Sequence, residues 1–296
     1  MAGLKEVRIR IASVKSTQQI TAAMKMVAAS KLRKAQNSII RLRPYAAKLR
    51  EILQNLSSSI EDSGESDYSA QRAPEKILLI VIASNRGLCG AFNSNIMKAT
   101  TGLINSKYAT QLSRGDVNLI TIGKKASEYF QKRSYKVIAT HDDFFNNLTF
   151  KEISLFAEYL MQVFMKKEFD RIEIIYNQFK NAAVQRLVTE QFLPVIQDNI
   201  SGKPANTRIT ADYIFEPDKE TVVKELIPKT LRIQIFKAVL DSFAAEMGAR
   251  MTAMQQATDN ARELLRSLNI AYNKARQNQI TNELIEIISG SEALQG

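Results

Sequence analysis

The stretch SNRGLCGAFN, residues 84–93, carries the residue types in this chain that are best suited to chemistry. It follows an apolar run and precedes an amphipathic one, which is where α/β proteins bind phosphates with flexible glycines and free helix amides. Its two glycines match neither the three-glycine dinucleotide fingerprint nor a P-loop. We therefore favour a structural turn, in which Gly87 and Gly90 bend the chain and Cys89 packs inward. A nucleotide-binding α/β enzyme is the alternative.

Other reactive groups are scarce. The single cysteine, Cys89, excludes an internal disulfide and any multi-cysteine metal site, and the single histidine, His141, excludes a histidine-cluster metal site. Cys89 as a nucleophile would need His141 as its base, and no pattern in the sequence pairs them. The acidic run HDDF, residues 141–144, is typical of a solvated loop. We expect no catalytic residue, cofactor or metal, and a mechanical or scaffold role.

Positive charge is concentrated at the start of the chain. The formal net charge is +11, and residues 1–56 hold twelve Lys and Arg against Glu6 and Glu51. Such a basic segment favours an acidic partner, namely nucleic acid, anionic lipid or an acidic protein surface. The longest apolar run, residues 77–83, is far shorter than the ~18 residues that a membrane-spanning helix needs.

The first 56 residues fit an unbroken heptad pattern, which predicts a long coiled-coil helix. One row of the pattern is Leu4, Ile11, Gln18, Lys25, Leu32, Ile39, Ala46 and Leu53. The other row is Val7, Val14, Thr21, Ala28, Ala35, Leu42, Leu49 and Leu56. The polar exceptions are consecutive and interrupt the seam at Gln18, Thr21 and Lys25.

A second long helix is predicted from Pro228, a good helix-starting residue, to Gly290. One of its rows is Ile233, Leu240, Met247, Met254, Ala261, Leu268, Ala275 and Asn282. The other is Phe236, Phe243, Arg250, Ala257, Leu264, Ala271, Asn278 and Ile285. We expect the two helices to pack antiparallel, with the N-terminus reaching about residue 270 and the last twenty or so residues unpaired.

Between the helices, continuous apolar strands alternate with helical patterns. Strands are expected at 76–84, 117–123, 135–140, 171–179 and 183–195. This alternation predicts a largely parallel sheet covered on both faces. The fold class is therefore an antiparallel coiled coil of terminal helices with an inserted Rossmann-like α/β domain. The expected boundaries are a first helix at 1–57, a linker at 58–75, the α/β domain at 76–200, a further segment at 201–227 and a second helix at 228–290.

Three stretches resemble one family: IASVKSTQQITAAMKMVAASKLRKAQ (11–36), SNRGLCGAFN (84–93) and MTAMQQATDNARELLRSLNIAYNKARQNQITNELIEIISG (251–290). Together, over nearly the whole chain, they resemble the gamma subunit of F-type ATP synthase, the central rotor shaft. The resemblance implies a non-catalytic subunit that couples ion flow through a membrane c-ring to ATP synthesis by rotation. The implied partners are alpha, beta and epsilon subunits and the c-ring, at the cytoplasmic face of a bacterial inner membrane.

The resemblance also implies contact residues. Lys25, Lys31, Arg33 and Lys34 would meet an acidic lever of each beta subunit, and Arg250, Gln277 and Thr281 would hydrogen-bond to beta. Residues 284–288 would turn inside an apolar sleeve, and Tyr213 and Glu216 would contact the c-ring. For the basic stretch, the alternative is a solvated face with polar seam residues that set the coiled-coil register.

Two departures from the family pattern limit the resemblance. With Cys89 alone, the chain cannot form the regulatory dithiol of chloroplast relatives. Asn85 replaces the Asp often found before RGLCG, so a salt bridge assigned to that position is in doubt. A nucleic-acid-binding coiled coil is a further hypothesis, although residues 1–43 carry no aromatic side chains for base stacking.

Overall fold

The computed structural model describes residues 4–57, 68, 70–146, 148–195 and 219–295. The elements, in chain order, are α1 (Leu4–Ser57), β1 (Ile77–Ile82), α2 (Phe92–Lys107), α3 (Ala109–Arg114), β2 (Val117–Ile122), α4 (Lys124–Lys132), β3 (Val137–Thr140), a 3-10 turn (Asp143–Phe145), α5 (Phe150–Met165), β4 (Arg171–Phe179), β5 (Gln185–Leu193) and α7 (Lys219–Gln295). The chain divides into two units. The coil unit is Met1–Ala28 with Arg250–Gly296, and the sheet unit is Ala29–Ala249.

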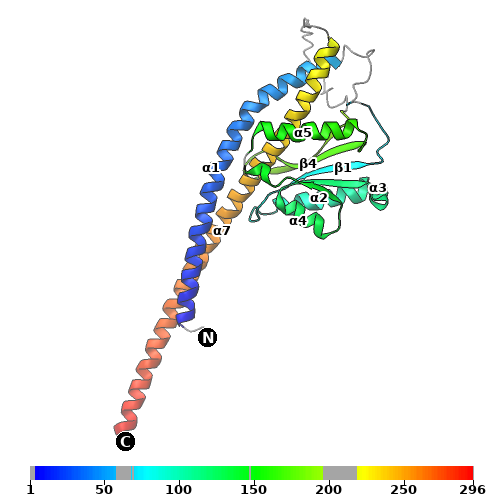
Figure 1. The fold of residues 1–296 in the computed structure, drawn as a ribbon. Helices are drawn as coiled ribbons and strands as arrows, with labels where there is room; N and C mark the ends of the chain where they lie inside the picture. The colour runs from blue at the N-terminus through cyan, green and yellow to red at the C-terminus, as the bar shows by residue number, and fades with distance from the viewer. Residues whose placement is uncertain (1–3, 58–67, 69, 147, 196–218, 296) are drawn as a thin grey trace. The chain divides into compact units, whose positions relative to one another are not determined.

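The sheet unit is built on a five-stranded sheet of order β3-β2-β1-β4-β5. The first four strands are parallel and β5 is antiparallel to β4, which confirms the prediction of a largely parallel sheet. Every residue of β1 and β2 is buried, because helices cover both faces of the sheet. Figure 1 shows α5 on one face and α2 and α4 on the other.

Alternate residues of β1 enter different hydrophobic cores. Leu78, Ile80 and Ile82 pack with α5 and with the part of α7 between Ile227 and Val239. The intervening β1 side chains pack with α2 and α4. Each fully buried Leu or Ile contributes about 1.5–3 kcal/mol, so this two-sided burial is what holds the sheet and α7 together within the unit.

The heptad pattern of α1 is confirmed by burial. Every described member of both predicted rows is buried or half-buried, whereas apolar residues outside the rows, such as Ile9, Ile20 and Met26, are exposed. Gln18 and Lys25 are half-buried along with the apolar members. The helix continues without interruption through Pro44.

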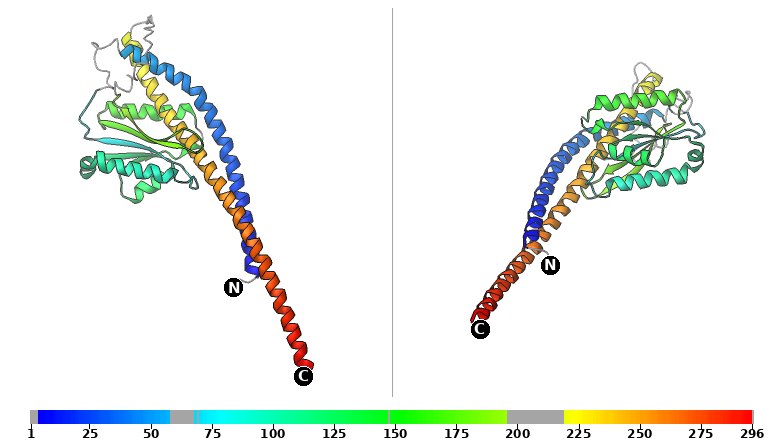
Figure 2. Two further views of the ribbon diagram at one scale, coloured as in Figure 1. Left: turned by 180° about the vertical axis from the view of Figure 1, so that it is seen from behind. Right: turned by 60° about the horizontal axis from the view of Figure 1, so that its bottom comes forward.

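In the coil unit, the start of α1 and the later part of α7 run antiparallel, as predicted (Figure 2). A hydrogen bond of 2.8 Å between the hydroxyls of Thr258 and Thr21 shows which residues lie opposite each other. Counting away from this pair in opposite directions places Leu4 opposite Ala275, slightly beyond the predicted residue 270. From Arg276 to Ser291 every side chain is exposed, as expected for an unpaired helix end.

One predicted row of α7 is wrong beyond Met254. Leu264 is 40% exposed, whereas Thr258 is buried and Leu265 and Tyr272 are half-buried. The seam therefore follows 254, 258, 261, 265, 268, 272 and 275, and the second row lies one residue later than predicted. The prediction followed apolar Ala257 and Leu264, whereas polar Thr258 occupies the seam because its hydroxyl is hydrogen-bonded there.

The predicted limits of the second long helix are also wrong. The helix α7 begins at Lys219 and contains Pro228, and it continues through Gly290 to Gln295. Pro228 removes one helical hydrogen bond, but buried Ile227 and Leu231 anchor the helix to the core on either side of it. The segment expected at 201–227 therefore ends in helix, and its part up to residue 218 lies outside the described residues. No helix in the described part of the chain is long and apolar enough to cross a membrane.

A buried carboxyl lies on α7 in the sheet unit. Asp241 is 3% exposed, and its Oδ1 atom has no hydrogen-bond partner among the described residues. Burial raises the pKa of Asp241 from 3.8 to about 6, an effect opposed by Lys237 and Arg43 and reinforced by Glu190. Because the folded state holds this proton more tightly than the unfolded state, the resulting stability is present below pH 4 and is lost as the pH rises towards 6.

We expect Asp241→Asn to raise the free energy of unfolding at pH 7.5 by up to about 3 kcal/mol, the value of a two-unit pKa shift. At pH 2.5 the variant and the parent should unfold with similar free energies, because this is well below 3.8 and Asp241 is then almost entirely neutral in both states. Urea denaturation at the two pH values measures the difference. Asp143→Asn, at an exposed position, is the control, and a gain from Asp241→Asn that does not depend on pH would contradict the assignment.

Candidate functional site

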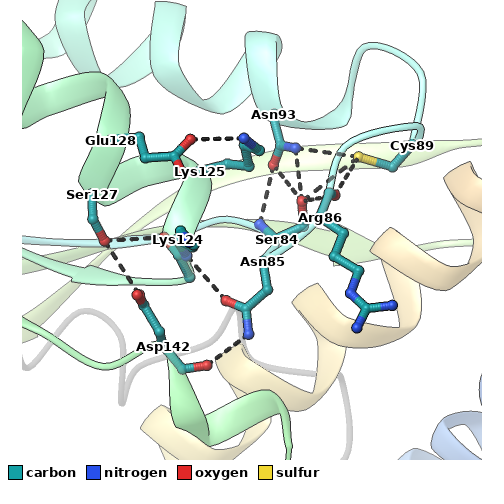
Figure 3. Close-up of polar contacts among 11 residues, drawn as sticks. Ser84, Asn85, Arg86, Cys89, Asn93, Lys124, Lys125, Ser127, Glu128 and Asp142 are labelled. Atoms are coloured by element: carbon teal, nitrogen blue, oxygen red, sulfur yellow. Dashed lines mark hydrogen bonds and ion pairs between the residues drawn. The ribbon is translucent and has the colours of Figure 1, made fainter.

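The loop after β1 satisfies its polar groups internally (Figure 3). The Asn93 amide donates to Ser84 Oγ at 2.7 Å and to Cys89 Sγ at 3.3 Å, while Asn93 Oδ1 accepts from the Ser84 backbone N–H at 3.1 Å. Ser84 Oγ also donates to the Arg86 carbonyl at 2.7 Å. Cys89 is 1% exposed. These groups support the loop itself, so the nucleotide-binding alternative has no structural support here.

The bend of this loop depends on two left-handed residues. Leu88 has φ +63° and Gly90 has φ +58°, a conformation that glycine adopts without strain. Gly87 differs from Gly90, because its φ is not positive and an added Cβ would meet no atom within 4 Å. The geometry therefore favours glycine at position 90, where any other residue would be strained, and makes no such demand at position 87.

Asn85 joins three loops at the carboxyl ends of neighbouring strands (Figure 3). Its Oδ1 accepts from the Lys124 backbone N–H at 3.0 Å, at the start of α4, and its Nδ2 donates to the Asp142 carbonyl at 2.7 Å, beyond β3. Gly123 allows the close approach, because a Cβ there would overlap the Ala83 carbonyl. Sequence reasoning treated Asn85 only as a departure and missed this role.

His141 and Cys89 belong to separate clusters. The ring of His141 stacks on Phe144 at 4.8 Å and packs against Phe156 at 4.7 Å. Burial lowers the pKa of His141, an effect that the Asp142 carboxylate partly opposes. The HDDF run is therefore a packed turn and not simply a solvated loop. Among the described residues, no group of three or more His, Cys, Asp or Glu could hold a metal ion.

The predicted contact residues differ in exposure. Lys31, Arg33 and Lys34 are exposed and Lys25 is half-buried. Arg250 is 9% exposed. Tyr213 and Glu216, the expected c-ring contacts, lie outside the described residues.

On the unpaired end of α7, Gln277 and Thr281 are both exposed, and the Thr281 hydroxyl donates to the Gln277 carbonyl at 2.9 Å. The side-chain amide of Gln277 forms no hydrogen bond to another described residue that would hold it in place. One polar exception of the first helix does not face outward: Thr21 is 9% exposed and pairs with Thr258, so it belongs to the seam and not to a partner-facing surface.

Comparison with known proteins agrees with this arrangement. The sequence model of the ATP synthase family matches residues 3–294. The ATP synthase gamma chain of Cytophaga hutchinsonii is 50% identical over 295 residues, with 99% of each chain covered. This chain belongs to the ATP synthase gamma family. The gamma chain of Flavobacterium johnsoniae is 51% identical over 300 residues, and both chains are covered completely.

Chains in solved ATP synthase structures share the fold. A chain in a Euglena gracilis mitochondrial ATP synthase structure has a TM-score of 0.70 at 24% identity and covers 98% of this chain and 94% of its own. A chain in the central stalk and c-ring structure of the Tetrahymena thermophila enzyme has a TM-score of 0.55 at 26% identity, covering 80% and 99%. Gamma-family membership thus accounts for two long terminal helices around one α/β domain.

We expect Asn85→Asp to lower the free energy of unfolding by about 0.5–1.5 kcal/mol, the net contribution of one hydrogen bond, because Asn85 is half-buried. A carboxylate could still accept from Lys124, but it cannot donate to the Asp142 carbonyl and would face the partial negative charge of that oxygen. Urea denaturation at pH 7.5 measures the loss. Asn95→Asp, at an exposed position on α2, should change stability little. If Asn85→Asp unfolds like the parent, the amide does not join the loops.

Proposed function

We propose that this gamma chain acts as a non-catalytic rotor shaft that couples ion flow through a membrane ring to nucleotide turnover in a surrounding ring of subunits. As a gamma chain it is the central stalk subunit of ATP synthase. The observation that carries the proposal is the coil unit, in which the two ends of the chain pair antiparallel and α7 continues unpaired. A helix pair is stiff along its axis, and its unequal sides can bias neighbouring sites differently as it turns.

The exposed end of α7 supports a contact with an apolar sleeve. Leu284, Ile285, Ile287 and Ile288 are each more than half exposed. A run of large apolar side chains in water marks an interaction surface. In the proposal this end turns within the ring of alpha and beta subunits. Gln277 and Thr281 form hydrogen bonds to beta there, and Arg250 forms another further towards the start of α7.

The basic side chains of α1 support a contact with acidic groups. Lys31, Arg33 and Lys34 are exposed. A cation of this kind attracts an anion over ~10 Å at moderate salt without fixed geometry, which suits a contact that forms and breaks in each turn. In the proposal these residues and Lys25 meet an acidic lever of each beta subunit. Family membership leaves the nucleic-acid hypothesis without an observation that favours it.

The remaining partners are assigned by the family alone. Solved structures with a similar fold come from complexes described as rotor, F1 and c-ring assemblies. We propose that Tyr213 and Glu216 contact the c-ring, that an epsilon subunit joins the base of the stalk, and that the complex lies at the cytoplasmic face of a bacterial inner membrane. Co-purification with alpha and beta subunits, followed by observation of rotation, tests the rotor proposal as a whole.

We expect a chain ending at Ala275 to assemble with alpha and beta subunits at least roughly tenfold more weakly, because each 1.4 kcal/mol of lost apolar contact is a factor of ten. The torque of ATP-driven rotation should fall as well. Removal of side chains that are exposed in the free chain should leave the sheet unit as stable as before, and urea denaturation provides this control. Unchanged rotation and assembly would count against the sleeve contact.

We expect the triple variant Lys31→Glu, Arg33→Glu and Lys34→Glu to slow ATP hydrolysis by the assembled complex roughly fivefold, since an exposed ion pair contributes up to about 1 kcal/mol. The defect should shrink at high salt, because salt screens exposed charges. The matched control carries Lys98→Glu, Lys132→Glu and Lys151→Glu, three exposed lysines of the α/β domain. Equal defects in the two triple variants would show that net charge, and not the α1 surface, is responsible.

A further inference from the structure

Two threonines form a buried polar contact between the helices of the coil unit. Thr21 is 9% exposed and Thr258 is 8% exposed. The Thr258 hydroxyl lies 2.8 Å from the Thr21 hydroxyl and 2.7 Å from the Met254 carbonyl, and the Thr21 hydroxyl donates to the Gln18 carbonyl at 3.0 Å. Thr21 can therefore accept from Thr258 while its own proton stays on its own helix.

The fully buried apolar side chains of the coil unit are small or flexible, and larger seam residues such as Val14 and Leu265 are only half-buried. Among the described residues of the coil unit, the other buried side chains are Ala28, Met254, Ala261 and Arg250. Alanines make shallow knobs and methionine adapts to irregular gaps, so apolar packing alone discriminates weakly between one alignment and another. A hydrogen bond between two buried hydroxyls adds a preference for the one alignment in which they meet.

We propose that the Thr21–Thr258 pair fixes the axial register of the antiparallel coil. A shift of one heptad would place Thr258 opposite Val14 or Ala28, neither of which can accept a hydrogen bond. The Thr258 hydroxyl has one proton, and in a shifted alignment it would still donate to the Met254 carbonyl. The shift therefore costs the contact between the two hydroxyls and leaves each of them facing an apolar side chain. The effect of the pair is to favour one alignment, as a single polar seam residue does in other coiled coils.

The register matters for any load carried along the coil. A one-heptad shift displaces one helix by about 10 Å relative to the other, given a rise of 1.5 Å per residue. It would change how much of α7 extends beyond Leu4 and which side chains form each face. The register assignment itself does not depend on the rotor proposal, because it concerns the isolated chain.

Engineered cysteine pairs in a Cys89→Ser chain measure the register. Val14→Cys with Leu265→Cys joins positions that are opposite in the alignment set by the threonine pair. Val14→Cys with Tyr272→Cys joins positions that meet only after a one-heptad shift. A disulfide needs Cα atoms within about 7 Å, so each pair reports one alignment. With both threonines present, only the first pair should cross-link efficiently.

We expect Thr21→Val with Thr258→Val to raise the yield of the shifted cross-link, relative to the aligned one, roughly two- to tenfold, the factor that one hydrogen bond represents. Thr21→Ser with Thr258→Ser keeps both hydroxyls and should behave like the parent. A change in overall stability alone would not alter this ratio. The ratio therefore separates a register role from ordinary packing.

The proposal is overturned if the valine variant keeps the parental ratio of cross-links, because apolar packing would then suffice to set the register. Circular dichroism checks that the helices persist, and Thr21→Ala with Thr258→Ala replaces the valine variant if they do not. For the alanine variant, the ratio of the shifted to the aligned cross-link decides the outcome in the same way. Since cross-linking uses the free chain, a failure of the rotor proposal would leave this result unaffected, and the reverse also holds.

Discussion

The packing of α1 against α7 is the interaction on which the rest of the structure depends. Each helix carries a seam that is apolar along most of its length, and neither seam can be hidden from water by its own helix. In the coil unit the seams cover each other, and in the sheet unit α7 also closes one face of the sheet. Thr21 and Thr258 form a buried polar contact within the seam of the coil unit, and Asp241 is a buried carboxyl on α7 in the sheet unit.

The α/β domain has the outline of a nucleotide-binding fold, but the polar side chains described at the end of β1 bond to one another. Phosphate sites at strand ends rely on backbone amides that remain available to a ligand. Here the loop after β1 uses Ser84, Asn93 and Cys89 to support itself, and Asn85 joins the neighbouring loops. These contacts make the strand ends rigid, which suits a domain that transmits force more than one that binds and releases a ligand.

Much of the fold could be read from the sequence because its signals are periodic and long. The α1 rows, the buried strands and the pairing of the two chain ends all rest on repeated burial, and each is confirmed. Predictions failed where a single residue overrode the pattern. Pro228 normally marks a helix start, yet core contacts on both sides keep it inside α7. Ala257 and Leu264 continued an apolar row, yet the seam turned to Thr258 and Leu265.

The candidate site residues also divide into those that the sequence predicted and those that it missed. The exposure of Lys31, Arg33 and Lys34 was visible in the sequence, because they lie outside the heptad rows of α1. The unpaired end of α7 was visible because the second helix extends beyond the start of the first. The joining role of Asn85 was not visible, since it depends on backbone groups of residues about forty and sixty positions away. The sequence by itself determined which faces must be buried. Only the tertiary structure decided which buried polar groups meet. A hydrogen bond requires the donor–acceptor distance to match to within a few tenths of an ångström, and no sequence repeat specifies positions that closely.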